Sequence, residues 1–558
     1  MKTILLILTI WLLALTASST TWYVSKAGSD GNSGASWSQA WLTLTNVNDS
    51  TEFSHGDTAI IGAGGWREEL YLISGTETDK TCYMDSAWSM GTEDSRVAWI
   101  YGSDSLHTWT QIDATNVYIC SYTPTVMDDQ VGIWQGDSIL FRQTDSADVN
   151  VAGESWYGNN HIVAYVYGGD DPDNYQIEIG QRNCVLQCRG DAGVLKPGQD
   201  NVTLIGLGFK YSRNHQFTGC ATGQWELGWD SCLISHCYFA CNTGGGAGNA
   251  SLIYAGRAGI PNDNNTDPRY SELLDGFDYN RYNACSLGMN YTFQAALPQQ
   301  QKSYNGGGMN FYGQRYSVID SNVFWGYLKD DGALKFKCMY DADDGAGAYD
   351  TIRFNTFNCA TDALLQMWSG THHFAIYGNT FQNTENTSGI YMEYSALGVA
   401  GAGYHKIYNN TFYDCRMVSE NGQAGYDFPY RENEFKYNVM YESTGLTTVY
   451  FDSTKFWIDV DSNLYYAASG TNEWLSDSAT YTWSQWQTAG MDAHGIENTD
   501  PAFNSAATGD FSRPSASGEM NRTYGGQTWI VFGAVQNAGT TTKTLKIKGG
   551  YLKGVKIE

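Results

Sequence analysis

Hydrophobic and polar positions along this chain recur in one short pattern: an apolar residue, two variable residues, Asn, one variable residue and Phe. Its copies, some of them degenerate, begin at Leu204, Ile234, Ile319, Ile352, Ile376, Ile407 and Phe435. In the last five copies, consecutive Asn residues are 24 to 33 residues apart. A repeat of this length, made of short β-strands and turns, is typical of a solenoid.

The pattern predicts how each coil is built. The apolar residue and the Phe are expected to point into the coil and to stack on their equivalents in the coils above and below. The Asn is expected at the bend between two strands, because Asn tolerates left-handed backbone geometry and bonds locally to the backbone. Repeated in every coil, these residues would form an Asn ladder.

A further set of strands follows the motif and alternates between inward and outward residues. The inward positions include Leu334, Phe336, Met367, Ile390 and Met392. The outward positions form two columns, the first with Asn310, Lys335, Gln366, Tyr391 and Tyr450 and the second with Tyr312, Lys337, Trp368, Glu393 and Asp452. The strand near Arg416 falls between the last two strands in poorer register.

The N-terminus indicates export. Lys2 precedes an apolar run from Ile4 to Leu15, and small residues follow up to Ser19. This order is typical of a secretory signal peptide over residues 1–19. No later segment is apolar enough to span a membrane. We therefore expect a protein that is secreted or displayed at the cell surface.

Composition narrows the class of partner. The chain has 59 acidic and 32 basic residues and a formal net charge of −27, which argues against nucleic acid as a partner. Aromatic residues make up 14% of the chain, as suits an all-β protein. The 12 cysteines lack the spacing of a zinc module, which leaves buried thiols or a few disulfides.

Several segments resemble a known superfamily. The opening stretch 21–34, the first-coil segments 55–61 and 64–69, and the closing segments 500–503, 509–511 and 532–534 are similar to those of the pectate-lyase-like proteins. The resemblance covers roughly residues 21–536. It implies a right-handed parallel β-helix, a fold found among extracellular polysaccharide lyases and glycosidases. It says less about activity, because many functions share this scaffold.

This fold predicts the organisation of the chain. The signal peptide 1–19 is followed by an N-terminal cap with the first coils (20–106), a β-rich insertion (107–180) and the main β-helix (181–538). Long segments near 244–305 and 455–498 interrupt the coil rhythm and are expected to be insertions. Residues 539–558 form a basic C-terminal tail that could cap the solenoid or mediate self-association.

The outward columns predict a surface that binds polysaccharide, since aromatic faces stack on sugar rings while charged groups bind hydroxyls and move protons. For hydrolysis, Glu393 and Asp452 would be the acid and base. With one coil between them, their backbones would lie roughly 10 Å apart. Asp331, in an Asp-Asp bend before Leu334, is a second candidate carboxylate.

For β-elimination, the base would be Lys335 or Lys337, with Arg416 or Arg353 as its partner. Asp341, Asp343, Asp344 and Asp350 could hold Ca²⁺ beside the substrate; otherwise no cofactor is expected. A third hypothesis is a non-catalytic adhesin or fibre subunit that uses the aromatic face for contact. Asn-x-Ser/Thr sequons would be glycosylated only in a host with that machinery.

Overall fold

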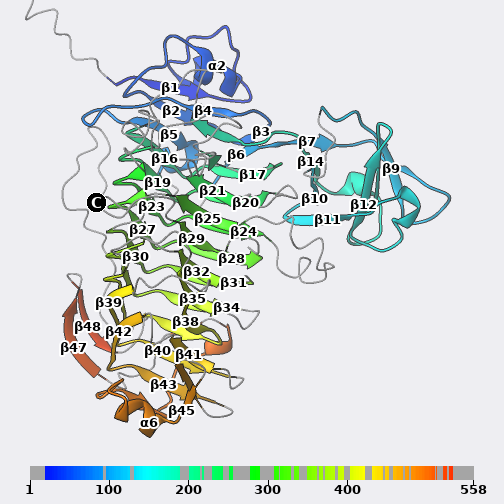
Figure 1. The fold of residues 1–558 in the computed structure, drawn as a ribbon. Coiled ribbons are helices and arrows are strands. Elements are labelled where there is room, and N and C mark those ends of the chain that lie inside the picture. Colours follow the sequence, from blue (N-terminus) through cyan, green and yellow to red (C-terminus); the bar gives the residue numbers. More distant parts are fainter. Residues whose placement is uncertain are drawn as a thin grey trace, which may run out of the picture.

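The structure is a computed structural model. It describes residues 19–91, 96–125, 131–188, 200–213, 217–218, 229–242, 251–255, 277–289, 307–312, 314–327, 332–337, 349–360, 363–368, 371–383, 388–394, 403–421, 430–443, 447–451, 456–468, 472–476, 479–508, 510–511, 519–524 and 527–531. The described residues form a column of stacked coils, and a separate β-sheet projects from the column near its N-terminal end (Figure 1).

Three 12-stranded sheets make up the column. Sheet A contains β1 (Thr21–Val24), β2 (Thr58–Ile61), β5 (Thr81–Asp85), β16 (Val202–Ile205), β19 (Leu233–Ser235), β23 (Arg281–Asn283), β27 (Val318–Asp320), β30 (Thr351–Arg353), β33 (Ala375–Tyr377), β36 (Lys406–Tyr408), β39 (Tyr430–Lys436) and β42 (Phe456–Asp461). Sheet B contains β3 (Gly64–Trp66), β6 (Ala98–Tyr101), β17 (Gly208–Ser212), β20 (Tyr238–Asn242), β24 (Ser286–Met289), β28 (Val323–Tyr327), β31 (Thr356–Ala360), β34 (Thr380–Asn383), β37 (Thr411–Tyr413), β40 (Val439–Glu442), β43 (Leu464–Ala467) and β46 (Ile496–Glu497).

Sheet C contains β4 (Leu70–Leu72), β15 (Leu186–Cys188), β18 (Phe217–Thr218), β21 (Ser251–Ala255), β25 (Gly307–Tyr312), β29 (Leu334–Lys337), β32 (Ala363–Trp368), β35 (Ser388–Tyr394), β38 (Arg416–Asn421), β41 (Thr447–Phe451), β44 (Glu473–Ser476) and β45 (Ala479–Tyr481). All neighbouring strands in the three sheets pair in parallel, except the terminal pair β44 and β45. This is the parallel β-helix that the repeat predicts.

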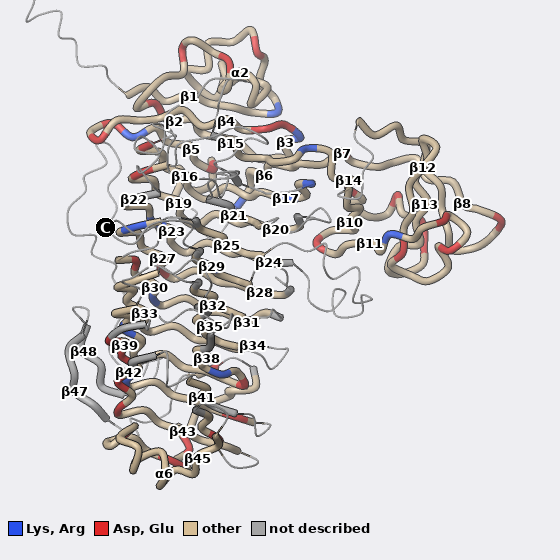
Figure 2. Tube along the Cα trace, in the orientation of Figure 1, with Lys and Arg blue, Asp and Glu red and all other residues tan. Residues whose placement is uncertain are grey.

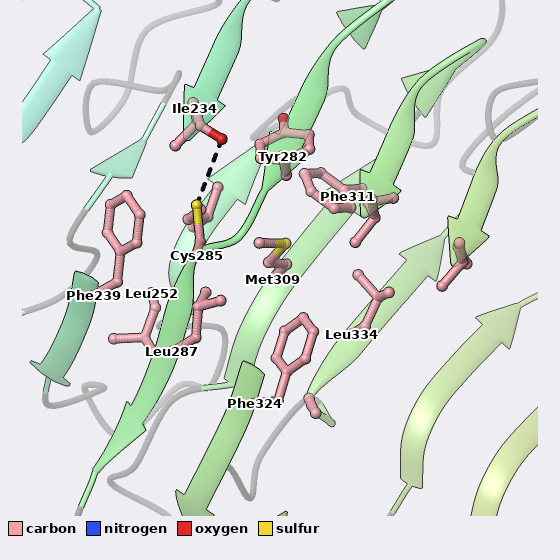
Figure 3. Close-up of a cluster of buried hydrophobic side chains, with 14 of the residues drawn as sticks. Ile234, Phe239, Leu252, Tyr282, Cys285, Leu287, Met309, Phe311, Phe324 and Leu334 are labelled. Atoms are coloured by element: carbon pink, nitrogen blue, oxygen red, sulfur yellow. Dashed lines mark hydrogen bonds between the residues drawn. The ribbon is translucent and has the colours of Figure 1, made fainter. Parts of the chain in front are cut away.

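The core confirms the predicted inward positions. Leu334, Phe336, Met367, Ile390 and Met392 are all buried within one continuous cluster that runs along the column. The Phe residues of the repeat stack coil on coil, with ring centroids 4.6 Å apart for Phe324 and Phe357 and 4.9 Å apart for Phe357 and Phe381. Figure 3 shows part of this interior, where apolar side chains from successive strands pack together.

The Asn ladder is also present, but the residue with left-handed geometry at the bend is the one before the rung, as at Ser321 and Tyr437, and not the ladder Asn itself. Its buried rungs are Asn322, Asn355, Asn379, Asn410, Asn438 and Asn463. Each rung donates its backbone N–H and side-chain amide to the side-chain oxygen of the next, as Asn355 does to Asn379 at 3.0 and 2.9 Å. Each amide also donates to a backbone carbonyl of the preceding coil, as from Asn379 to Ile352. The ladder thereby satisfies buried polar groups that the bend would otherwise leave unpaired.

Each end of the column is covered by a short helix (Figure 1). At the N-terminal end, α2 (Leu44–Asp49) buries Leu44 and Val47 against the first coils. At the C-terminal end, α6 (Trp483–Thr488) buries Trp486 and begins with a capping box at Thr482. These helices cover coil ends whose apolar interior would otherwise face water.

The projecting part is an eight-stranded sheet with its own apolar core. Its strands, in spatial order, are β7 (Ser103–Leu106), β14 (Ile177–Gly180), β10 (Ile133–Gln135), β11 (Ser138–Arg142), β12 (Glu154–Gly158), β13 (His161–Tyr165), β9 (Tyr118–Ser121) and β8 (Thr110–Gln111). Two ion pairs join it to the column, Arg67 with Glu178 and Lys210 with Asp137. The insertion is therefore packed against the coils rather than tethered by a linker.

The two other expected insertions differ from the prediction. Within 244–305, strands β21, β23 and β24 each continue one of the three sheets. Within 455–498, β42, β43 and β44 do the same. Both segments therefore contain coil strands, which the weak repeat motif in these regions concealed. The remaining parts of 244–305 lie outside the described residues.

The remaining described elements are small. They are α3 (Ser86–Ser89), the 3₁₀ turns Trp37–Gln39, Ser146–Asp148, Pro172–Asn174 and Ala506–Thr508, the paired strands β22 (Phe277–Asp278) and β26 (Gln314–Arg315), and the hairpin of β47 (Glu519–Tyr524) and β48 (Gln527–Val531). The basic tail 539–558 lies outside the described residues. None of the described helices has the length and apolar character needed to cross a membrane.

The cysteines whose side chains the structure describes are all buried. They are Cys82, Cys120, Cys184, Cys232, Cys237, Cys241, Cys285, Cys359 and Cys415. Desolvation raises the pKa of the Cys232 and Cys237 thiols to about 12, which keeps them protonated and unreactive. In this part of the chain the thiols pack as small apolar side chains, as Cys285 does in Figure 3.

Candidate functional site

The first predicted outward column follows the strand register of sheet C. Asn310 is paired with Lys335, Lys335 with Gln366, and Gln366 with Tyr391. Tyr391 is then paired with Val418, and Val418 with Tyr450. The column is continuous, and Val418 fills the gap that sequence alone left between Tyr391 and Tyr450.

Burial varies along this column. Asn310 is fully buried, and Lys335 is only 5% exposed. Gln366, Tyr391 and Tyr450 are partly exposed. The openly exposed face that we expected is therefore absent at the N-terminal end of the column, and Lys335 has little surface to offer a substrate as a base. The partly exposed members of the first column lie on β32, β35 and β41.

The second column brings carboxylate residues onto neighbouring strands. Tyr312 is paired with Lys337. Phe336 is paired with Met367, so the residues that directly follow them, Lys337 and Trp368, occupy equivalent positions on β29 and β32. Trp368 is paired with Glu393, and Glu393 with Glu420. The backbone thus places Lys337, Trp368, Glu393 and Glu420 at one register position on four successive strands.

Glu420 is the residue that sequence reasoning missed. Strand β38 pairs with β35 across an irregularity between Ser388 and Ile390, so the alternation of the two strands cannot be aligned from the sequence. The buried Ser419 occupies an inward position where the other strands carry Met or Phe. The apolar Met417, three residues before Glu420, is fully buried and therefore marks an inward position. Counting alternate residues from Met417 puts Glu420 at an outward position.

Arg416 lies at the start of β38, where it is paired with Ser388. Its side chain is partly exposed, and among the described residues its buried Nε has no hydrogen-bond partner. Arg416 precedes Val418 by two residues and therefore shares the outward phase of the strand. It places a cation on the same strand as Glu420.

Arg353 does not belong to this face. It lies in β30 of sheet A, where its guanidinium donates to Asp320 Oδ2 at 2.9 Å and to the Tyr377 hydroxyl at 3.2 Å. The prediction that Arg353 could pair with Lys335 or Lys337 is therefore wrong, because the residue belongs to a different sheet. The same carboxylate also binds Arg281.

Some of the predicted residues, or their side chains, lie outside the part of the chain that the structure describes. Asp331, Asp341, Asp343, Asp344 and Asp452 lie outside the described residues, as do the side chains of Tyr312, Lys337, Trp368, Glu393 and Glu420. Asp350, the fourth proposed Ca²⁺ ligand, is buried, and its Oδ1 accepts the Ser317 backbone N–H at 2.7 Å. Across the described part of the chain, no group of three or more His, Cys, Asp or Glu side chains is arranged to hold a metal ion.

Charge on the described surface is dispersed. Figure 2 shows Lys and Arg scattered singly among Asp and Glu, without one continuous basic stripe along the column. Among the described residues, seven basic side chains form ion pairs with carboxylates: Arg67, Arg182, Lys210, Arg281, Arg353, Lys406 and Lys436. This distribution provides no extended surface suited to a polyphosphate chain.

No family model matches the chain, and no curated protein matches it in sequence. Among solved structures, XylC in complex with xylose has a TM-score of 0.53 and 14% identity, over 82% of this chain and 86% of that one. A glycoside hydrolase has a TM-score of 0.40 and 9% identity, over 85% and 99%. A rhamnogalacturonan lyase has a TM-score of 0.38 and 11% identity, over 79% and 87%. The likeness to XylC shows that the two chains share a fold.

Proposed function

We propose that this protein binds a polysaccharide along the outer face of sheet C and hydrolyses it, with Glu393 and Glu420 as the reacting carboxylates. The observation that carries the proposal is the direct pairing of Glu393 with Glu420 on adjacent strands. Glycoside hydrolysis requires two such carboxyl groups beside the scissile bond. Trp368, paired with Glu393, and the partly exposed Tyr391 are neighbours suited to sugar rings.

The spacing of the pair indicates a mechanism. Adjacent strands lie roughly 4.8 Å apart, close to the separation of about 5–5.5 Å between the carboxyl groups of retaining glycosidases. The pair predicted from sequence, Glu393 and Asp452, would be roughly 10 Å apart, near the wider inverting separation. We therefore propose a retaining mechanism, in which one carboxylate attacks the anomeric carbon and the other protonates the leaving oxygen.

The two carboxyl groups must differ in protonation for this chemistry. Two carboxylates at one strand spacing repel each other, so one of them keeps its proton to a higher pH. One of Glu393 and Glu420 is therefore proposed as the nucleophile and the other as the general acid.

The proposed class of substrate is based on the net charge of the chain and on one structurally similar protein. A net charge of −27 disfavours a strongly polyanionic polymer, so a neutral polysaccharide is proposed. XylC, which shares the fold, was solved with xylose, and xylan is therefore the first polymer to test. Export, predicted from residues 1–19, fits such a substrate because large polysaccharides are met outside the cell.

The test measures hydrolysis on a panel of xylan, a neutral glucan and polygalacturonate. New reducing ends without ultraviolet absorbance from an unsaturated product are expected. Glu393→Gln and Glu420→Gln should each lower the rate by about 10²-fold or more. Glu434→Gln on sheet A, which removes a carboxylate from another face, is the matched control and should leave the rate unchanged.

Other outcomes would contradict the proposal. An unsaturated product would indicate β-elimination, with Lys337 and Arg416 as the residues to substitute next. Binding without cleavage of any polymer would favour the adhesin hypothesis. Full activity in both Glu variants would remove the carboxylate pair from the mechanism.

A further inference from the structure

A ladder of aromatic rings runs along one edge of the column, at the turn that leads from sheet C into sheet A. It consists of Tyr279, Tyr316, Tyr349, His373 and Tyr404, one from each of five successive coils. The ring centroids are 5.2 Å apart between the tyrosines and 4.7 Å apart on either side of His373. The interplanar angles lie between 3° and 25°, so the rings are stacked nearly face to face.

The ladder is exposed. Tyr279, Tyr316 and Tyr349 are 63%, 44% and 46% exposed, and no other tyrosine among the described residues belongs to the exposed large hydrophobic side chains. His373 is exposed as well, and Tyr404 is partly exposed. An exposed row of large side chains over several coils indicates an interaction surface rather than a part of the core.

The backbone at these positions is unfavourable for aromatic residues. All five have a positive φ, between 53° and 59°, in the left-handed region where a bulky side chain costs about 1–2 kcal/mol. In the same turn, the two preceding coils carry Asn201 and Ser231 with similar φ. Smaller residues therefore suffice to make the turn, and ring stacking offsets only part of the strain.

The spacing of the ladder is fixed by the fold. The backbone N–H groups of Tyr279, Tyr349 and His373 donate to carbonyl groups of the next coil, at Arg315, His372 and Gly403. The rings therefore form a straight, rigid row along the column axis. Because their faces are covered by one another, the row presents ring edges and phenolic hydroxyl groups to solvent. Those hydroxyls have no hydrogen-bond partner within the described part of the structure, and each can donate and accept.

The ladder carries no charge at neutral pH. Burial and the nearby Lys406 lower the pKa of His373, and burial lowers the pKa of the adjacent His372 to about 4. Both imidazoles are therefore neutral, and the ring nitrogens of the two residues lie 2.9 Å apart. A row of neutral hydroxyls and apolar edges is complementary to a neutral, hydroxyl-rich polymer, and its rings supply no positive charge to bind a carboxylate or sulfate group.

The row also lies beside the proposed catalytic face. Tyr316 follows β25 by four residues and His373 follows β32 by five, so the ladder lies at the carboxyl ends of the sheet C strands. From these observations we propose that Tyr279, Tyr316, Tyr349, His373 and Tyr404 form a second carbohydrate surface that holds an extended neutral polysaccharide along the column axis. This inference rests on the proposed function for the class of polymer, and not on the carboxylate pair.

The test is adsorption of the full chain to insoluble xylan and to microcrystalline cellulose, with polygalacturonate as the charged comparison. The variant Tyr279→Asn/Tyr316→Asn/Tyr349→Asn keeps residues that accept the left-handed backbone. Its partition constant on the neutral polymers should fall by about tenfold or more, equal to about 1.4 kcal/mol. Cleavage of soluble oligosaccharides should be unchanged, since these need only the sheet C face.

Two further variants make the result specific. Tyr437→Asn is the matched control, because Tyr437 also has a positive φ, 60°, but lies at the turn between sheets A and B. It should adsorb like the wild type. The triple Tyr→Phe variant keeps the ring stack and removes the hydroxyls, so it should fold normally and lose adsorption, which covers the case in which the Asn variant is unstable.

Three results would overturn the inference. These are unchanged adsorption in the Asn and Phe variants, an equal loss in Tyr437→Asn, or tighter adsorption to polygalacturonate than to the neutral polymers. A wild-type dimer that dissociates in the variants without a change in adsorption would assign the ladder to self-association instead. If the wild type adsorbs through the ladder but cleaves nothing, the inference stands and the proposed hydrolase fails.

Discussion

Asn463 donates both its backbone N–H and its side-chain amide to Oδ1 of Asp492, at 3.1 and 2.9 Å. The Asn ladder thus ends on a carboxylate instead of another amide. The other oxygen of Asp492 accepts the Tyr465 hydroxyl at 2.6 Å and the Trp486 indole N–H at 3.1 Å. One buried carboxylate therefore joins the last rung, the last coil and the capping helix α6.

Replacement of this carboxylate should loosen the C-terminal cap. In Asp492→Asn, the new amide group faces the Trp486 indole N–H, so that at least one buried donor loses its acceptor. We expect the free energy of unfolding to fall by about 1–3 kcal/mol, measured by denaturant unfolding. Asp500→Asn, at an exposed position, is the control and should change stability little. Equal stability of the two variants would contradict the role assigned to Asp492.

A buried histidine should make stability depend on pH. Burial lowers the pKa of His405 to about 3, with His372 and His373 adding to the effect. Its Nδ1 accepts the Phe374 backbone N–H at 3.3 Å, which requires the neutral ring. The unfolded chain has a normal histidine pKa of about 6.5 and binds a proton that the folded chain excludes. The contribution of His405 to the free energy of unfolding is therefore fully present above about pH 6.5 and is lost as the pH falls towards 3.

The size of this effect is measurable. Within that window the loss is about 1.4 kcal/mol per pH unit. In the next coil, Asn433 already occupies the position that corresponds to His405. We therefore expect His405→Asn to flatten the dependence of the free energy of unfolding on pH between about pH 6 and about pH 4. His161→Asn, at an exposed position of the insertion, should leave the profile unchanged. Parallel profiles for all three proteins would show that His405 does not carry the dependence.

The stability of the projecting insertion should depend on Glu178. This carboxylate is fully buried, forms an ion pair with Arg67 and accepts the Ser103 hydroxyl at 2.7 Å. Glu178→Ala removes the acceptor of the buried Ser103 hydroxyl and the partner of the partly exposed Arg67 guanidinium, and we expect a loss of about 1–3 kcal/mol. Limited proteolysis should show faster cleavage within residues 103–180 than in the coils. Glu52→Ala, which removes an exposed carboxylate, should behave like the wild type.

The stereochemistry of the product tests the geometry of the carboxylate pair. If Glu393 and Glu420 act together, one strand spacing apart, the first product should retain the anomeric configuration of the substrate. Proton NMR of the anomeric signals during early turnover measures this directly. Inversion would instead assign the chemistry to Glu393 and Asp452, two strands apart. That result would keep the outer face of sheet C as the substrate-binding surface and would replace Glu420 with Asp452 as the second carboxylate.

Much of the column is encoded locally in the chain. The apolar residue, Asn and Phe of each motif lie within six residues of one another, and each has one geometric role that does not depend on the rest of the molecule. For this reason the buried Ile376 and Phe381 and the ladder residue Asn379 could be placed from the repeat alone. Strand alternation then placed Met367 and Met392 in the core, because a one-residue shift would expose every apolar side chain.

Relationships between coils depend on tertiary structure, because the turns that join the strands vary in length and strand register is set by stacking. The irregularity beside Ser388 aligned Glu420 with Glu393, which spacing could not show. Packing buried Lys335 on a face where alternation alone predicted exposure, and sheet assignment separated Arg353 from the proposed lysine bases. The aromatic ladder, too, exists only once coils of unequal length bring Tyr279 and Tyr316 to the same turn, where their rings stack.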